Sequence, residues 1–173
     1  MTGKVREMIS EAQVNARIKE LAEQISEDYK GKGIHLICIL KGSVFFTCEL
    51  AKRLTIPVTI DFMSVSSYGS ETVSSGRVRI LKDLDESIQG KDILIIEDII
   101  DSGNTLSYLK DLLGTRAPKS LEICTLLDKP DRRVTSVDVK YVGFVIPDEF
   151  VVGYGLDYDQ YYRNLPFVGV VEQ

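Results

Sequence analysis

The segment ILIIEDIIDSGNT, residues 93–105, concentrates the side chains most able to do chemistry. Its aliphatic start predicts a strand buried on both faces, as in a parallel sheet covered by helices. Glu97 and Asp98 follow as adjacent carboxylates. Residues 101–105 form a small polar turn before leucines at helical spacing, with Gly114 as the expected C-cap. A strand, a polar turn and a helix start in this order indicate a site for an anion.

The polar turn carries the groups that bind a phosphate. Amides in the first turn of a helix lack internal partners and lie at the positive end of the helix dipole. Ser102 and Thr105 add hydroxyls, and Gly103 lets the backbone approach closely. Asp101 and Asn104 complete the turn. The acidic pair before it would repel a bare polyphosphate, so it requires sugar hydroxyls, a divalent metal or a developing cation. A phosphate beside hydroxyls is typical of a ribose 5-phosphate; the Walker A and GxGxxG patterns do not occur.

Two acids after an aliphatic strand, followed by Asp-Ser-Gly-x-Thr, resemble the segment of type I phosphoribosyltransferases that binds phosphoribosyl diphosphate (PRPP). Four further segments narrow the resemblance to the 6-oxopurine branch, the hypoxanthine-guanine phosphoribosyltransferases. They are LKGSVFF from residue 40, SSYGSETVSSG at 66–76, LLDKPDRR at 126–133 and DEFVVGYGLDYDQYYRNLP at 148–166. The resemblance covers almost the whole chain. It implies a purine salvage enzyme that forms IMP or GMP and pyrophosphate from PRPP and hypoxanthine or guanine.

The resemblance also implies how the chain binds PRPP. Lys41 and Gly42 would hold the pyrophosphate, in a loop that often contains a non-proline cis peptide, and Arg163 would assist them. Glu97 and Asp98 would face the ribose hydroxyls. The 5-phosphate would lie on the turn formed by Asp101, Ser102, Gly103, Asn104 and Thr105. Some relatives have a basic residue in place of Asn104, so the backbone amides would contribute more here.

A magnesium ion is the expected cofactor, because Mg²⁺ combines few carboxylates with waters and phosphate oxygens. Glu97, Asp98 and Asp157 are its candidate ligands. Asp101 is the candidate base that takes the proton from the incoming purine nitrogen. Ser67 and Tyr68 would belong to a mobile hairpin loop, residues 66–76, that closes over the substrate as a lid. The alternative for this loop is a disordered hairpin tip.

The base would be bound by residues near the C-terminus of the chain. Lys129 would donate to the 6-oxo group, Phe150 would stack on the ring, and Val151 and Asp157 would contact the base. Each has a plainer alternative. Lys129 could be a solvated lysine in a charged run, Phe150 a core residue and Asp157 a solvated turn residue, while Arg163 could form a surface salt bridge.

Several elements must position these groups. A helix begins at Ser10, where Gln13 completes a capping box. Strands are expected near 35–40, 58–62, 78–80, 93–96, 121–127 and 139–146, with helices at 44–54 and from 106, and the segment after Pro147 is expected to be irregular. This alternation predicts an α/β fold with a mostly parallel, Rossmann-like central sheet flanked by helices. We expect one domain, residues 1–173, with a small hood from the N- and C-terminal segments. Ligands would bind beyond the carboxyl ends of the strands.

Composition limits the function classes. The chain has 173 residues, 44% hydrophobic and 27% charged, and a net charge of -5, which argues against a broad nucleic-acid surface. Apolar runs stay below the ~18 residues of a membrane span. The first residues lack the apolar core of a signal peptide, and three scattered cysteines suit a reduced, cytoplasmic protein. Expected partners are PRPP, a 6-oxopurine, pyrophosphate and further copies in a homodimer or homotetramer, with no nucleic acid and no membrane.

Two other functions remain open at this level. Some transcription regulators use this fold and PRPP loop to bind RNA or DNA, although they need a basic surface. Phosphoribosyltransferases for adenine, orotate or xanthine are the second alternative. Lys129 separates the adenine case, because a lysine donor suits a 6-oxo group and adenine presents an amino group there. The sequence does not rank hypoxanthine, guanine and xanthine.

Overall fold

The computed structural model describes residues 3–68 and 77–172. Its elements follow the order β1 (Lys4–Ile9), α1 (Glu11–Asp28), β2 (Ile34–Leu40), α2 (Val44–Arg53), β3 (Val58–Tyr68), β4 (Arg77–Lys82), β5 (Asp92–Ile100), α3 (Asn104–Gly114), β6 (Ser120–Asp128), η1 (Pro130–Arg132), β7 (Tyr141–Val145), β8 (Val151–Val152) and β9 (Val168–Glu172). Within the described ranges, no helix has the length and apolar character that crossing a bilayer requires.

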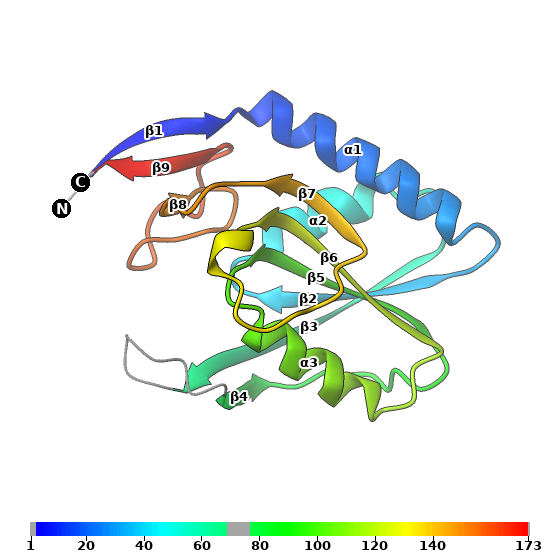
Figure 1. The fold of residues 1–173 in the computed structure, drawn as a ribbon. Coiled ribbons are helices and arrows are strands. Elements are labelled where there is room, and N and C mark those ends of the chain that lie inside the picture. The colour runs from blue at the N-terminus through cyan, green and yellow to red at the C-terminus, as the bar shows by residue number, and fades with distance from the viewer. Residues whose placement is uncertain (1–2, 69–76, 173) are drawn as a thin grey trace.

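Six strands form the central sheet in the order β4-β3-β2-β5-β6-β7. All neighbours run parallel except β4, which returns antiparallel to β3. The helices α1 and α2 cover one face and α3 covers the other (Figure 1). The predicted mostly parallel sheet flanked by helices is therefore confirmed.

β5 is the centre of this arrangement and is buried on both faces. Leu94 and Ile96 pack into the cluster under α1 and α2, and Ile93 and Ile95 pack into the cluster under α3. All four side chains are 0% exposed. Their β-branched and aliphatic character is what a strand between two helical layers requires. The strand continues to Ile100, so the acidic pair lies within the last part of β5 rather than beyond it.

The helix boundaries confirm one predicted cap and correct another. Ser10 and Gln13 form both hydrogen bonds of the capping box at the start of α1. Gly114 is the last residue of α3, and the C-cap is Thr115 in a right-handed conformation, so the predicted glycine C-cap is wrong. The hydroxyl and amide of Thr115 both donate to the carbonyl of Leu112, and the left-handed residue at this helix end is Ala117, with φ at +55°.

A second sheet of three strands has the order β1-β9-β8. It joins the two ends of the chain, since β1 pairs antiparallel with β9 and β9 with β8. This sheet lies beyond the carboxyl ends of the parallel strands (Figure 1). The predicted hood from both chain ends is thus present. Its strands were not predicted, because β8 has two residues and the partners in β1 and β9 are distant in sequence.

His35, the single histidine of the chain, provides a pH-dependent test of this fold. Its ring lies in β2 with 4% exposure, and Nδ1 is 2.7 Å from Thr59 Oγ1. Burial, and then the charge of Lys91, lower the pKa of His35. Below about pH 6.5 the unfolded chain therefore binds a proton more readily than the folded protein does, which reduces the free energy of unfolding.

We predict that wild-type protein loses stability more steeply between pH 7.5 and pH 5 than the His35→Gln variant. Urea unfolding at several pH values measures this, and the other titrating groups cancel in the difference between the two proteins. Parallel curves would contradict the prediction.

Candidate functional site

The acidic pair Glu97 and Asp98 is held at the end of β5 with both side chains half-buried. The amide of Asp98 donates to Glu97 Oε1 at 3.1 Å, and the amide of Ile99 donates to Asp98 Oδ1 at 2.7 Å. Burial and the adjacent charge of Asp98 raise the pKa of Glu97, and burial raises the pKa of Asp98. Negative charge on the pair is therefore disfavoured in the protein alone, and a ligand that supplies hydroxyl donors or positive charge would stabilise it.

The loop after β2 packs directly on this pair. The loop contains one non-proline cis peptide bond, which lies between Leu40 and Lys41. A Cβ atom on Gly42 would lie 1.7 Å from Asp98 Oδ2, and one on Gly155 would lie 1.9 Å from the carbonyl oxygen of Gly42. Only glycines allow these approaches, so β5, the loop and the C-terminal tail meet at one point.

The predicted phosphate turn borders a small cavity. This cavity of about 160 Å³ is lined by residues that include both acids of the pair, Asp101, Ser102, Gly103 and Thr105. Gly103 is the N-cap of α3 with φ at +85°, and Ser102 Oγ accepts from the amide of Asn104 at 3.2 Å. The acids and the start of α3 therefore line one space, as the sequence predicted.

Residues 133–135 support this turn, a role that no local sequence pattern indicated. The amides of Val134 and Thr135 donate to the carbonyl of Ser102 at 2.9 and 3.0 Å. Thr135 Oγ1 donates to Asn104 Oδ1 at 2.5 Å. Arg133 pairs with Asp128 and also donates to the carbonyl of exposed Asp101 at 3.1 Å. The segment thus fixes the backbone of the turn from outside.

A group of polar side chains from the tail lies against the loop after β2. Arg163 donates from Nη1 to the carbonyl of Gly155 at 2.7 Å and pairs with Asp157 Oδ1 at 3.2 Å. Lys41 Nζ and Arg163 Nη2 each donate to Gln160 Oε1 at 3.2 Å. The structure brings the predicted residues together and adds Gln160, which the sequence analysis missed. Its position in the sequence between Asp157 and Arg163, two predicted site residues, could have indicated it.

The residues predicted to bind a base lie beside the hood. Lys129 is 6% exposed and its amide donates to the carbonyl of Ile100 at 3.0 Å, which fixes it next to the end of β5. Its Nζ lies 3.9 Å from Asp148 Oδ1, beyond hydrogen-bond distance, while Arg132 Nε binds the same oxygen at 2.8 Å. The alternative of a solvated lysine is wrong, because Lys129 is buried.

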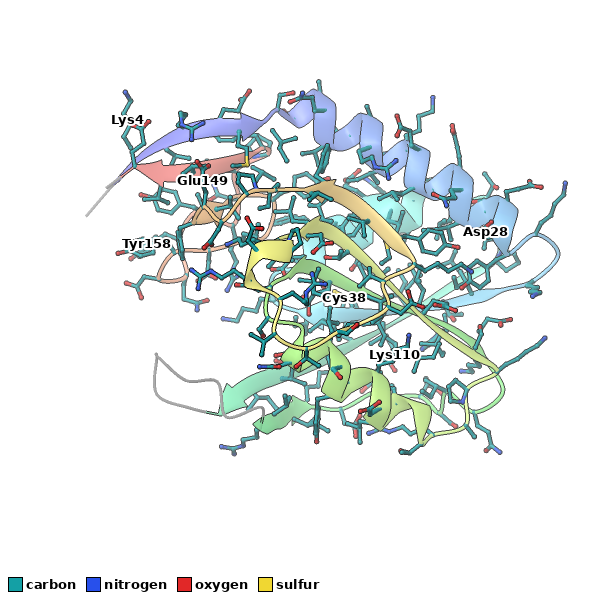
Figure 2. All side chains as sticks on the ribbon, in the orientation of Figure 1. Lys4, Asp28, Cys38, Lys110, Glu149 and Tyr158 are labelled. Carbon is teal, nitrogen blue, oxygen red and sulfur yellow. The ribbon has the colours of Figure 1, made fainter. Side chains whose placement is uncertain are left out.

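Phe150 is 54% exposed, so the alternative of a core phenylalanine is also wrong. Its ring meets Tyr158 edge to face with centroids 5.6 Å apart, and Val151 follows it, buried in β8. Tyr158 and Glu149 lie at the hood end of the molecule, opposite Asp28 at the end of α1 (Figure 2). Phe150 thus offers an exposed apolar ring face, and Lys129 offers a buried donor.

Other predicted elements are only partly described. Ser67 and Tyr68 end β3, and the rest of the predicted lid, residues 69–76, lies outside the described residues. Within the described ranges, no group of three or more His, Cys, Asp or Glu side chains is arranged to hold a metal.

Comparison with known proteins identifies the family. Residues 7–159 match the family model of the phosphoribosyl transferase domain. The chain belongs to this family. It is 57% identical to hypoxanthine phosphoribosyltransferase of Salmonella typhimurium, over 96% of this chain and 95% of that protein. Identity with hypoxanthine-guanine phosphoribosyltransferase of Mycobacterium avium is 53%, over 95% and 84% of the two chains.

A crystal structure of hypoxanthine-guanine phosphoribosyltransferase from Bacillus anthracis is similar throughout. It matches with a TM-score of 0.94 and 50% identity, over 99% of this chain and 100% of that chain. The phosphoribosyltransferase fold therefore extends over the hood as well as the central sheet. The resemblance inferred from the motifs is confirmed at the level of the family.

The contact between Gly42 and Asp98 can be tested by adding one methyl group. Gly42→Ala should destabilise this phosphoribosyltransferase by about 1–3 kcal/mol, because either the loop or the carboxylate must move. Gly114→Ala is the matched control, since a Cβ there meets nothing within 4 Å and alanine favours a helix by about 0.5–1 kcal/mol. Urea unfolding of both variants measures the difference. Equal stability of the two would show that the Gly42 contact is not tight.

Proposed function

We propose that this chain transfers the 5-phosphoribosyl group from PRPP to hypoxanthine or guanine, forming IMP or GMP and pyrophosphate. The observation that carries the proposal is the single cavity lined by the acidic pair and the turn at the start of α3. The names of relatives at 57% and 53% identity support the same reaction. The half-buried acids and the helix start suit the ribose hydroxyls and the 5-phosphate of one substrate.

PRPP would lie across three groups of residues. The 5-phosphate accepts hydrogen bonds from amides and hydroxyls of residues 101–105, where the dipole of α3 is positive. The ribose hydroxyls donate to Glu97 and Asp98, which partly relieves the disfavoured negative charge of the pair. The pyrophosphate faces Lys41, Gly42 and Arg163, where two cations offset its charge.

Bond breaking at C1 separates charge. Positive charge develops on the ribose ring and negative charge on the departing pyrophosphate. The carboxylates of Glu97 and Asp98 stabilise the first, and Arg163 and the donors at Lys41 stabilise the second. The purine nitrogen that bonds to C1 loses its proton to Asp101, which lines the same cavity. Ser67 and Tyr68 belong to the lid that would exclude water.

The donor set fits a magnesium ion. Glu97 and Asp98 offer hard carboxylate oxygens whose charge is disfavoured in the protein alone, so a divalent cation would stabilise them. Asp157 would contribute from the tail, where Arg163 now pairs with it. Magnesium takes most of its remaining ligands from water and phosphate, which suits a site with few protein ligands. When bound, the ion would neutralise charge on the pyrophosphate.

The base would be recognised at the hood. Lys129 donates to the 6-oxo group, Phe150 stacks on the purine ring, and Val151 offers backbone groups to the edge of the base, near Asp157. Lys129 suits this role because it is buried and its Nζ has no hydrogen-bond partner among the described residues. A buried donor without a partner favours an acceptor on the ligand.

Nucleotide formation tests the proposal. PRPP and Mg²⁺ are incubated with hypoxanthine, guanine, xanthine or adenine, each offered separately, and products are separated by chromatography. Hypoxanthine and guanine should react and adenine should not, because its 6-amino group cannot accept from Lys129. A lack of product with every base, together with tight PRPP binding, would instead favour a PRPP-responsive regulator of nucleic acid.

Replacing Asp101 by asparagine should separate chemistry from binding. Loss of a general base lowers kcat by about 10²–10⁴-fold, whereas the amides that hold the 5-phosphate remain, so PRPP affinity should stay nearly constant. Steady-state kinetics and calorimetric PRPP titration measure the two effects. A variant with full activity would remove Asp101 from this role.

A further inference from the structure

Gln160 occupies the centre of the cationic end of the site. Its backbone has φ at +70°, and its amide donates to Asp157 Oδ2 at 2.8 Å. Its side-chain oxygen accepts from Lys41 Nζ and from Arg163 Nη2, each at 3.2 Å. One neutral oxygen therefore joins two cations that come from opposite ends of the chain.

Only one of the two cations has an ion-pair partner among the described residues. Arg163 pairs with Asp157 at 3.2 Å, whereas Lys41 forms no ion pair with any described residue. Like charges at this separation repel each other, and a shared acceptor between them offsets part of that repulsion. A neutral amide does so without cancelling either charge.

The backbone around Gln160 is fixed on the same loop. Gly155 packs on the carbonyl of Gly42, and Arg163 donates to the carbonyl of Gly155. The tail is therefore anchored on both sides of Gln160. The side chain of Gln160 adds the only described side-chain hydrogen bond from the tail to Lys41.

We propose that Gln160 is a positioning residue for the pyrophosphate part of the substrate. It holds Lys41 and Arg163 side by side, and because it is neutral it leaves their charge available to the pyrophosphate. This inference rests on the proposed function, which supplies the pyrophosphate as ligand. It assigns a role to Gln160 in binding PRPP and pyrophosphate, and none in binding the base or in proton transfer.

Two substitutions separate hydrogen bonding from charge. Gln160→Glu keeps the size and the acceptor oxygen but replaces the amide NH2 group by a second carboxylate oxygen, which adds a negative charge beside the two cations. Gln160→Asn keeps a neutral amide and tolerates positive φ, but it is one methylene too short to reach both cations. Gln89→Glu is the control, because it adds the same charge on an exposed residue before β5, at the opposite end of the parallel strands.

The measurements are KM for PRPP, KM for hypoxanthine, kcat, and the Kd of inorganic pyrophosphate by calorimetry in the presence of Mg²⁺. Gln160→Glu should raise KM for PRPP and Kd for pyrophosphate about tenfold, since one partly screened charge is worth on the order of 1 kcal/mol. Gln160→Asn should raise both about threefold. KM for hypoxanthine should stay unchanged in both variants, and Gln89→Glu should match wild type. Thermal melts confirm that each variant is folded.

Unchanged pyrophosphate affinity in Gln160→Glu would overturn the inference. So would a parallel rise in KM for hypoxanthine, which would indicate general disruption of the site. Failure of the proposed function would give a different result, because the wild-type protein would then form no nucleotide from any base. Calorimetric pyrophosphate binding does not depend on turnover, so it decides the role of Gln160 in either case.

Discussion

The close approach of Gly42 to Asp98 is the constraint on which the site depends. A buried strand ends in two carboxylates, and the backbone of a neighbouring loop lies directly on one of them. Gly155 then packs on Gly42, so the tail is placed by the same contact. Gly42 leaves no room for a side chain between the loop and Asp98, and Gly155 leaves none between the tail and the loop. A shift in one of these elements therefore displaces the others.

The packing of β5, the loop after β2 and the tail also separates the charges of the site. The acidic pair lies in β5, where burial raises the pKa of both carboxyls, and the cations Lys41 and Arg163 lie together over the loop. This arrangement suits a substrate with a hydroxyl-bearing part that donates hydrogen bonds to carboxylates and an anionic part that binds cations. The ribose would meet the acids, and the pyrophosphate would meet the cations. Burial makes the interactions of the acidic pair stronger than they would be in water.

The hood has a separate part in this design. Phe150, next to β8, is exposed, whereas Lys129 is buried. An edge-to-face contact with Tyr158 orients the Phe150 ring. Arg132 binds Asp148 at hydrogen-bond distance, whereas Lys129 Nζ lies farther from it and forms no hydrogen bond within the described structure. In the proposed function, the base would bind apart from the phosphate turn, at Lys129 and the segment that begins at Phe150.

The sequence by itself determined the central sheet, its mostly parallel order and the turn at residues 101–105, because aliphatic periodicity and local turn chemistry are encoded within short segments. It also supplied the capping box at Ser10. The roles of Gln160 and Thr135, and the strands of the hood, depended on contacts between residues far apart in the chain, which local patterns do not contain. The burial of Lys129 and the exposure of Phe150 were decided in the same way. Only the tertiary structure brings the tail onto the loop, because that packing requires glycines at two distant positions to meet.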